Sequence, residues 1–316
     1  MKKLTVSVAL ALYNGEKFIE KQLDTLRLQT VKPNQVVLCD DGSSDNTVNI
    51  VNEYIKKYSL GDSWKVYKNP QNLGYAKNFY HAMELCDGDL IYLCDQDDIW
   101  KNDKIEKMNK VMEENPNISL LMCKGGVIGA DDRELHGMMI KKSEETEKIT
   151  KISVEDIIRI FDWTGMLMCV RKEFFEQRKS IIYEISAPHD FVLALSAADC
   201  EQFYVYDYVG AYHRRHSNNA ANEEHRISKI LNLKRKIRDI DNYNGYLYNV
   251  VNSNIGIQKN SMNMLEERLK KSQQRKQALE DKSIKKLFKL YFSDDKKMLR
   301  PISFLCDTWL VLFGRI

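Results

Sequence analysis

The sequence has no pair of cysteines spaced as CxxC, although its 316 residues include seven cysteines. The seven are scattered and most lie in apolar runs, so they predict buried free thiols in a reducing compartment, with neither a disulfide framework nor a zinc site. No GxGxxG follows the first expected strand, and no Walker-type GxxxxGK motif occurs. A nicotinamide site and a Walker-type phosphate loop are therefore disfavoured.

The two most apolar ends of the chain also fall short of targeting or membrane segments. The start, MKKLTVSVALALYNG, faintly resembles a secretion signal, but residues 13–16 end its apolar run and no small-residue cleavage site follows. A first β-strand is expected there. The end, PISFLCDTWLVLFGRI, is too short to span a bilayer and is interrupted by Asp307.

Charge is distributed unevenly along this otherwise ordinary globular composition. Residues 1–225 carry 28 basic and 36 acidic side chains, whereas residues 226–316 carry 20 basic and 9 acidic ones, a net charge of +11. The asymmetry predicts a catalytic domain over 1–225 and a basic helical region over 226–316 that faces an anionic partner.

The first half alternates apolar strands with amphipathic helices. Strands are expected at 4–12, 35–39, 64–68 and 90–94, and helices at 16–29, 47–58, 75–84 and 102–115. This alternation predicts an α/β fold with a mostly parallel sheet covered by helices on both faces. Further on, strands are expected at 120–129 and 203–220 and a helix at 188–198.

Polar clusters follow three of the expected strands. They are Tyr13-Asn14, then Asp40-Asp41-Gly42-Ser43, and last Asp95-Gln96-Asp97-Asp98. Because ligands collect at the carboxyl ends of parallel strands, the three clusters are expected to converge on one cleft.

The third cluster crowds its charges, since two carboxylates about 4 Å apart repel by ~4 kcal/mol at an effective dielectric near 20. A hard divalent cation, Mg²⁺ or Mn²⁺, suits the oxygens of Asp95-Gln96-Asp97, whose alternate side chains lie on one side of an extended backbone. Alternatively, Asp97 or Asp98 caps a helix from about Ile99. The motif alone leaves both interpretations open.

The second cluster, CDDGSSDNT, also has two interpretations. It fits a turn followed by a helix cap at Ser44 or Asp45. It fits equally a site in which Asp40 accepts the N3–H of a uracil or thymine ring.

Six separated motifs carry a resemblance to a known family. They are ALYNGEKFIEKQLDTLRLQT, VVLCDDGSSDNT, NPQNLGYAKNF, GDLIYLCDQDDIW, HDFVLALSA and YHRRHSNN. In order and approximate spacing they resemble family-2 glycosyltransferases, which have the GT-A nucleotide-sugar fold and invert the anomeric centre. The QDDIW form and the Arg-x-His-x-Asn-Asn element are most similar to the bacterial rhamnosyltransferase-type branch. The resemblance covers roughly residues 4–220.

The resemblance implies a role for each matching residue. Asp190 would be the general base, and Asp97 and His216 would ligate a divalent cation, Mn²⁺ or Mg²⁺. The implied nucleotide-sugar-binding residues are Ala11, Tyr13, Asn14, Glu16, Asp40, Asn72, Lys77, Asp95, Gln96 and Arg215. Where the family often has Tyr-Arg-Gln-His-Gly-Asn-Asn, this chain has His-Arg-Arg-His-Ser-Asn-Asn. The difference leaves open whether His213 or Arg215 shares the phosphate role, and whether His213 or His216 contacts the metal.

The implied reaction moves a sugar, with L-rhamnose one candidate, from a UDP- or dTDP-linked donor to a glycan or lipid-linked glycan of a cell-surface polysaccharide. A carboxylate takes the acceptor's proton, and a cation with Lys or Arg absorbs the charge of the leaving diphosphate. Without the resemblance, Asp190 would be interpreted as a first-turn acid favoured by the helix dipole, and His216 as a loop histidine. Two rivals stay open, a glycoside hydrolase with paired carboxylates and a non-catalytic nucleotide-sugar binding module.

The basic region after residue 226 is interpreted as a solvated helical bundle, a nucleic-acid site or a surface that docks on an anionic membrane. Tyr243, Tyr246 and Tyr248 recur near helical spacing, which favours packing over base stacking. We therefore expect no nucleic acid, and a peripheral location on the inner, cytoplasmic face of the plasma membrane. A homo-oligomer is compatible with the sequence. The basic and apolar residues expected to dock are Lys285, Lys286, Lys289, Lys296, Lys297 and Arg300 with Leu287, Phe288, Phe304, Leu305, Trp309, Leu310, Leu312 and Phe313.

Overall fold

The structure is a computed structural model that describes residues 3–135, 145–159, 163–216, 232–253, 256–293 and 299–314. It divides into two compact units. The sheet unit comprises Met1–Ile152, Trp163–Tyr183 and His189–Arg215, and the helical unit comprises Ser153–Asp162, Glu184–Pro188 and His216–Ile316. The domain boundary expected after residue 225 stays a prediction, because residues 217–231 lie outside the described part.

Four parallel strands form the first half of the sheet, in the order β3-β2-β1-β4. They are β1 (Val6–Leu12), β2 (Gln35–Asp40), β3 (Trp64–Lys68) and β4 (Leu90–Cys94). Their register places Leu12 beside Asp40 and Leu10 beside Cys94, so the carboxyl ends of β1, β2 and β4 lie at one edge. Because β4 is buried along its whole length, apolar residues run through it without alternation.

The sheet continues through β8, β6, β9 and β5, and β7 pairs with β9. The long β6 (Leu120–Ile128) runs parallel to β9 (Phe203–Arg214), whereas the short β5 (Ile99–Trp100), β7 (Ile149–Lys151) and β8 (Met168–Arg171) pair antiparallel. The longer ladders are thus parallel, and the predicted α/β fold with a mostly parallel sheet is confirmed. The three short strands were not predicted, because runs of two to four residues carry too little periodicity.

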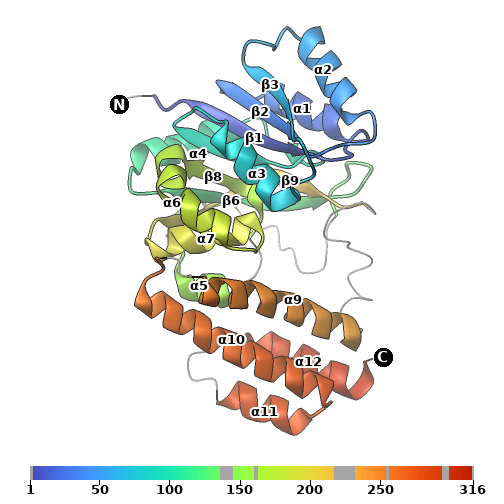
Figure 1. Cartoon of the computed structure of the whole chain (residues 1–316), viewed down its shortest axis with the longest axis vertical. Coiled ribbons are helices and arrows are strands. Elements are labelled where there is room, and N and C mark those ends of the chain that lie inside the picture. Colours follow the sequence, from blue (N-terminus) through green and yellow to red (C-terminus); the bar gives the residue numbers. More distant parts are fainter. Residues whose placement is uncertain are drawn as a thin grey trace. The chain divides into compact units, whose positions relative to one another are not determined.

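Helices flank this sheet, and α3, α6 and α7 lie over the face turned towards the viewer in Figure 1. In α1, the buried residues Ile19, Leu23 and Leu26 recur at helical spacing and form one apolar stripe. The five helices expected in this unit are present, with ends that differ by a few residues, whereas α6 was not predicted. The helices are α1 (Ile19–Arg27), α2 (Thr47–Lys57), α3 (Tyr75–Glu84), α4 (Lys104–Glu114), α6 (Lys172–Glu184) and α7 (His189–Asp199).

The helical unit confirms the expected helical C-terminal region for the described residues. Asn232 and Ser283 cap α9 and α11, because each side chain accepts a hydrogen bond from the backbone N–H three residues on. No described helix is long and apolar enough to cross a membrane. The helices are α5 (Val154–Arg159), α9 (Leu233–Asn252), α10 (Lys259–Glu280), α11 (Ile284–Phe292) and α12 (Pro301–Phe313). The core of the unit contains Leu233, Ile240, Ala278, Leu279, Leu287 and Leu310.

Asp307, which interrupts the apolar run of α12, is fully buried. Arg275 of α10 donates two hydrogen bonds to its carboxylate, at 2.6 and 2.8 Å, and the Tyr291 hydroxyl of α11 donates a third at 2.8 Å. One carboxylate therefore joins α10, α11 and α12. Since a buried charge is unfavourable without its partner, this ion pair fixes the rotation of α12 about its axis.

We expect Asp307→Ala to destabilise the helical unit by about 3–5 kcal/mol, because the Arg275 charge would be left buried without its partner. Amide hydrogen exchange in α10–α12 measures this loss without assuming that the two units unfold together. Glu280→Ala is the control, since it removes only a solvent-exposed ion pair with Lys276 and should cost less than about 1 kcal/mol. Equal protection in the two variants would contradict the role given to Asp307.

Candidate active site

Hydrogen bonds join the loops that follow β1 and β2. Asn14 lies in the left-handed region with φ of 49°, which asparagine tolerates better than most residues. Its side-chain oxygen accepts the N–H of Ser44 at 2.8 Å, and its own N–H donates to the Ser43 hydroxyl at 2.9 Å. The N–H of Gly15 donates to the Thr47 hydroxyl at 2.7 Å. The structure thus brings the first two polar clusters together.

Gln96, the middle residue of the acidic triplet, joins the end of β4 to the end of β1. Its carboxamide accepts the backbone N–H of Tyr13 at 2.9 Å and donates to the Tyr13 carbonyl at 2.7 Å. A Cβ at Gly15 would lie 2.2 Å from the Gln96 amide oxygen, so a side chain there would displace the Gln96 carboxamide. The Tyr13 ring itself is exposed, and Ala11 is half-buried in β1. The donor contacts expected of Ala11, Tyr13 and Gln96 stay predictions.

Glu16 and Asp45 tie the loop after β1 to the start of α2. The Glu16 carboxylate accepts the N–H of Asn46 at 3.0 Å, and the Glu16 N–H donates to Asp45 at 3.1 Å. Asp45 also accepts the N–H of Thr47, the first residue of α2, at 3.0 Å. The helix cap expected at Ser44 or Asp45 is therefore misplaced, because Asn46 occupies the N-cap position and its side chain makes no capping hydrogen bond, while Asp45 lies one residue earlier. A donor contact of Glu16 stays a prediction.

Asp41 organises the loop that leads into α3. Its buried carboxylate accepts the backbone N–H groups of Leu73 at 2.7 Å and Gly74 at 2.9 Å, and the Asn69 side chain at 2.8 Å. The Asn72 side chain donates to the Asp41 carbonyl at 2.8 Å. Asp41 received no role of its own from the sequence, although the second acid of an Asp-Asp pair was the available signal.

Asp40 and Lys77 lie on either side of that loop in the sequence. Asp40 ends β2, is buried, and has the N–H of Ser43 at 3.3 Å from both carboxylate oxygens. Lys77 is exposed on α3. The expected contact of Asp40 with a nucleobase stays a prediction, and so does the expected contact of Lys77 with the donor.

The acids after β4 are still crowded in the folded chain. Burial, and after it the charges of Asp98 and Asp97, raises the pKa of Asp95 well above its usual value. Asp98 is buried, and one of its oxygens accepts the backbone N–H of Arg214 at 3.0 Å. Its other oxygen has no hydrogen-bond partner among the residues that the structure describes. The site therefore concentrates negative charge where little solvent screens it.

The helix-cap interpretation of Asp97 and Asp98 is wrong. The residues that follow them form β5, which pairs with β9, and α4 begins only at Lys104, after Asp103. The extended backbone is stabilised because it buries Trp100 and pairs β5 with β9.

Two basic residues at the end of β9 hold the acidic loop. Arg214 is buried, donates from Nε to the Asp97 carbonyl at 2.7 Å, and pairs with Asp132. His213 has Nδ1 3.2 Å from Asp98. Although burial opposes its charged form, the hydrogen bond and charge of Asp98 raise the pKa of His213 to about 9. Sequence reasoning did not single out Arg214, for which the run of basic residues at 213–216 was the only signal.

The remaining residues of this basic motif are less closely defined. The Arg215 N–H donates to the Ile128 carbonyl at 2.9 Å, which extends the parallel ladder of β6 and β9. His216 belongs to the helical unit, and residues 217–219 lie outside the described part. The phosphate contact of Arg215 and the metal contact of His216 therefore stay predictions.

Asp190 lies in the first turn of α7. Burial raises its pKa to about 6, although the backbone N–H groups of Phe191, at 2.8 Å, and Gly165 favour the ionised carboxylate. After burial and the nearer acids, the charge of Asp190 also contributes to the raised pKa of Asp95. Asp190 thus adds a minor part to the negative field at Asp95. A carboxyl with this pKa is ionised at neutral pH and is still basic enough to accept a proton.

His189, next to Asp190, fills the space between α3 and the turn at Gly165–Leu167. Its ring stacks on Phe79 with centroids 4.1 Å apart and meets Tyr75 edge-on at 6.1 Å. Burial lowers its pKa to about 3, so the ring is neutral, and neither nitrogen has a hydrogen-bond partner among the described residues. A Cβ at Gly165 would lie 2.5 Å from its Nε2. The ring therefore positions the start of α7.

The acidic loop fits a divalent cation that a bound diphosphate completes. In the described part of the chain, no group of three or more His, Cys, Asp or Glu side chains is arranged to hold a metal ion by itself. Mg²⁺ commonly takes only one or two carboxylates, with water and substrate phosphates as its other ligands. The oxygens of Asp95 and Asp97 are hard ligands of this kind, and the charges of Asp98 and Asp97, after burial, disfavour the ionised form of Asp95 when no cation is present.

Residues 7–177, more than half of the sequence, match the profile of the family described as "Glycosyl transferase family 2". The chain belongs to glycosyl transferase family 2, as the resemblance of its motifs predicted. A Haemophilus influenzae protein described as an uncharacterized glycosyltransferase is 30% identical over 149 residues, which are 47% of this chain and 56% of that protein. The chain spans about half the length of the relatives that it matches.

Solved structures of glycosyltransferases share the fold. S. aureus TarS in complex with UDP-GlcNAc aligns with a TM-score of 0.59 and 18% identity over 93% of this chain and 82% of the TarS chain. The mannosyltransferase PcManGT from Pyrobaculum calidifontis, in complex with GDP-Man and Mn²⁺, aligns at 0.55 and 13% over 99% of this chain and 85% of its own. At these identities the likeness concerns the fold alone, and it confirms the predicted GT-A fold.

We expect Gly165→Ala to lower the rate of sugar transfer about tenfold or more, because the new Cβ must displace the His189 ring or the backbone beside Asp190. Initial rates at saturating donor measure this loss, and the donor KM should change little. Gly61→Ala is the control, since the nearest atom to its Cβ would be 3.9 Å away.

The same pair of sites gives a double-mutant cycle. In a His189→Ala background, Gly165→Ala should cost almost nothing further, because the ring that it would strike is absent. Losses that simply add would show that the two residues do not interact.

Proposed function

We propose that the chain is an inverting glycosyltransferase in which Asp190 is the general base and the acidic loop after β4 receives the donor diphosphate. One feature supports this proposal: Asp190 begins α7 with a carboxyl whose pKa burial raises to about 6, and its charge adds to the raised pKa of Asp95. Carboxyl groups whose surroundings shift their pKa values in this way are typical of acid–base sites. Membership of glycosyl transferase family 2 supports a transferase over a glycoside hydrolase or a non-catalytic binding module.

In the proposed reaction, the acceptor hydroxyl attacks the anomeric carbon from the face opposite the diphosphate, and Asp190 takes its proton. The bond from that carbon to the diphosphate oxygen breaks as the glycosidic bond forms, so the anomeric centre inverts without a covalent intermediate. Lys77, Arg215 and the protonated His213 are proposed to stabilise the negative charge that develops on the diphosphate.

The proposed donor is a nucleoside-diphosphate sugar. TarS has been solved with UDP-GlcNAc and PcManGT with GDP-Man, which supports this donor class. Asp40 is proposed to accept the N3–H of uracil or thymine, and the exposed Tyr13 ring is proposed to lie against the base. These roles favour UDP- or dTDP-linked sugars, and the QDDIW motif favours L-rhamnose among them.

A divalent cation, Mn²⁺ or Mg²⁺, is proposed at Asp97, with Asp95 and His216 as its other protein contacts. When bound, such a cation supplies the positive charge that stabilises a leaving diphosphate. The Mn²⁺ in the PcManGT complex supports this choice of cofactor. Within the chain, His213 and Arg214 would keep the acidic loop in place by their contacts with Asp98 and with the carbonyl of Asp97.

The proposed acceptor is a glycan, free or lipid-linked, of a cell-surface polysaccharide. The basic charge of residues 226–316 supports contact with an anionic membrane, on the cytoplasmic face of the plasma membrane. Association of copies into a homo-oligomer is compatible with this placement.

Thermal unfolding in the presence of nucleotide sugars tests the donor and the cation together. A ligand that binds only the folded state at 100 times its Kd adds about 2.7 kcal/mol of stability. We expect UDP- or dTDP-sugars to raise the melting temperature, and to raise it further with Mn²⁺. Asp97→Asn should remove the Mn²⁺-dependent part of the shift, whereas Asp62→Asn, an exposed acid in a turn, should leave it unchanged. If Mn²⁺ changes the melting temperature with donor in neither the wild type nor the variants, the proposed metal site is excluded.

The pH dependence of transfer tests the base. Below its pKa of about 6 the Asp190 carboxyl holds a proton and cannot accept another, so the rate should rise with pH through about 6 and then level off. Asp190→Asn should lower transfer about 10²–10⁴-fold at every pH, while the thermal shift with donor stays as in the wild type. Unchanged transfer in this variant, or a rate independent of pH in the wild type, would refute the assignment.

A further inference from the structure

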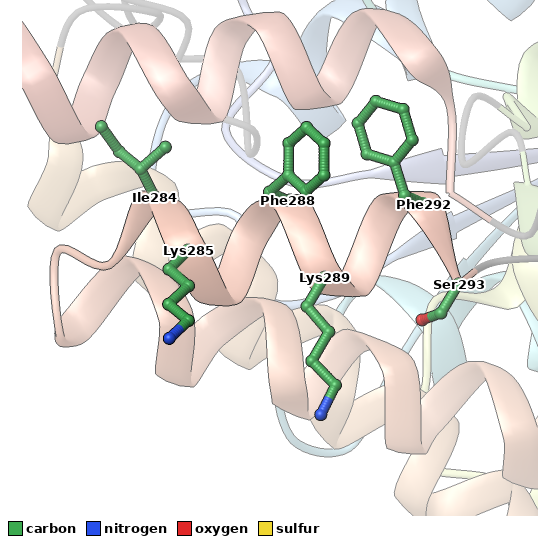
Figure 2. Close-up of a pocket in the computed structure, with 6 residues that line it drawn as sticks. All are labelled: Ile284, Lys285, Phe288, Lys289, Phe292 and Ser293. Carbon is green, nitrogen blue, oxygen red and sulfur yellow. The ribbon is translucent and has the colours of Figure 1, made fainter.

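An unusually apolar surface lies on the last two helices of the helical unit. On α11 the exposed apolar residues are Ile284, Phe288 and Phe292, which repeat every four residues and so form one stripe. The rings of Phe288 and Phe292 stack with centroids 4.0 Å apart, although each side chain is more than half exposed. With Lys285, Lys289 and Ser293 they line a groove of about 710 Å³ along α11 (Figure 2).

The stripe continues onto α12. Leu305, Leu312 and Phe313 are each more than half exposed there, and Trp309 lies between them at 39% exposure. Phe304 of α12 joins the two helices, because its ring meets that of Phe288 at 6.4 Å and that of Phe292 at 5.9 Å. The two stripes are therefore one surface.

This surface is separate from the residues that hold the unit together. Leu287 of α11 and Leu310 of α12, which the sequence placed among the docking residues, are buried in the core of the unit. Asp307 is the only charged residue of α12, and it points inward to Arg275. The outer face of α12 therefore has no charge, and water alone is a poor environment for it.

Lysines border the apolar stripe of α11. Figure 2 shows Lys285 and Lys289 projecting from a different side of the helix from Ile284, Phe288 and Phe292. Both lysines are exposed, and their spacing of four residues makes a second row parallel to the apolar one. A basic row beside an aromatic row is the arrangement of a helix that lies in the plane of a membrane interface. In that position the lysine stems follow the apolar surface and their ammonium groups reach the lipid phosphates.

We propose that the outer face of α11 and α12 inserts shallowly into one leaflet of an anionic lipid bilayer, with Phe288, Phe292, Leu305, Trp309 and Leu312 among the acyl chains. Charge decides the occupant of this surface. A second copy of the chain would bring another region of net charge +11 towards the first, whereas an anionic bilayer complements that charge. The inference deepens the proposed function, because a lipid-linked acceptor resides in the same leaflet.

Co-sedimentation of the full chain with vesicles of phosphatidylcholine, alone or with phosphatidylglycerol, tests the surface. The wild type should bind the anionic vesicles at least tenfold more tightly than the neutral ones. Phe288→Ser with Phe292→Ser should reduce binding to anionic vesicles at least tenfold, and so should Leu305→Ser with Leu312→Ser. Tyr248→Ser is the matched control, since that residue is equally exposed on α9 and should leave binding unchanged. Equal binding by all of these proteins would overturn the proposal.

Charge reversal separates the basic row from general attraction. Lys285→Glu with Lys289→Glu should weaken binding to anionic vesicles several-fold more than Lys259→Glu with Lys270→Glu, two exposed lysines of α10. Equal weakening would overturn the role given to the row. Light scattering without vesicles tests whether a second copy of the chain covers this surface instead. If the wild type is a dimer and Phe288→Ser with Phe292→Ser is a monomer, the surface is a dimer interface and the proposal is overturned.

Fluorescence of Trp309 tests insertion on the unmodified surface, so the proposal does not depend on whether a variant folds. Anionic vesicles should shift the emission of the wild type to shorter wavelength, and Trp309→Phe should lose that shift while it still binds. An unchanged spectrum in the bound wild type would contradict insertion. The thermal shift with the donor is measured in parallel. If the donor stabilises the protein but vesicles do not bind, only this inference fails. If vesicles bind but the donor gives no thermal shift, the proposed function fails.

Discussion

Like charges held together at the end of β4 are the constraint on which the site depends. Asp95, Asp97 and Asp98 follow one buried strand, and carboxylates this crowded repel more strongly as water is removed from around them. His213 and Arg214 from β9 offset this repulsion, because they contact the loop at Asp98 and at the Asp97 carbonyl. Those contacts exist because β5, directly after the acids, pairs with β9. The sheet therefore supplies the positive charge that the loop lacks.

The other strand ends are held to this loop by bonds that leave little freedom. Gln96 connects the ends of β4 and β1 through both sides of its amide, and Asp41 fixes the loop between β3 and α3. A Cβ would displace the Gln96 carboxamide at Gly15 and would strike the His189 ring at Gly165. A site whose groups are fixed before substrate arrives loses less entropy in reaching the reactive geometry. That benefit explains why several polar side chains at this edge bind the protein itself.

In the helical unit, the buried Asp307 determines which face of α12 is buried and which is exposed. The ion pair of Asp307 and Arg275 turns the polar position of that helix inward, where Leu310 lies in the core, and leaves Leu305, Trp309 and Leu312 outside. A helix with apolar residues on all sides has no preferred rotation, so the buried carboxylate specifies which side faces out. The same sequence feature that breaks the apolar run thus creates the apolar surface.

The sequence by itself determined the alternating strands and helices, the acids at three strand ends and the family, because periodicity and short motifs are local properties of the chain. It gave β1, β2, β4 and α3 within a few residues, and missed β5, β7 and β8, whose few residues become strands only through partners elsewhere. The tertiary structure alone decided that Gln96 meets Tyr13 and that His213 meets Asp98, pairs separated by 83 and 115 residues. It alone decided that Leu287 and Leu310 are core whereas Phe288 and Leu312 are surface. Such pairings depend on strand register and helix rotation, which are set by packing of the whole chain and leave no local signal in the sequence.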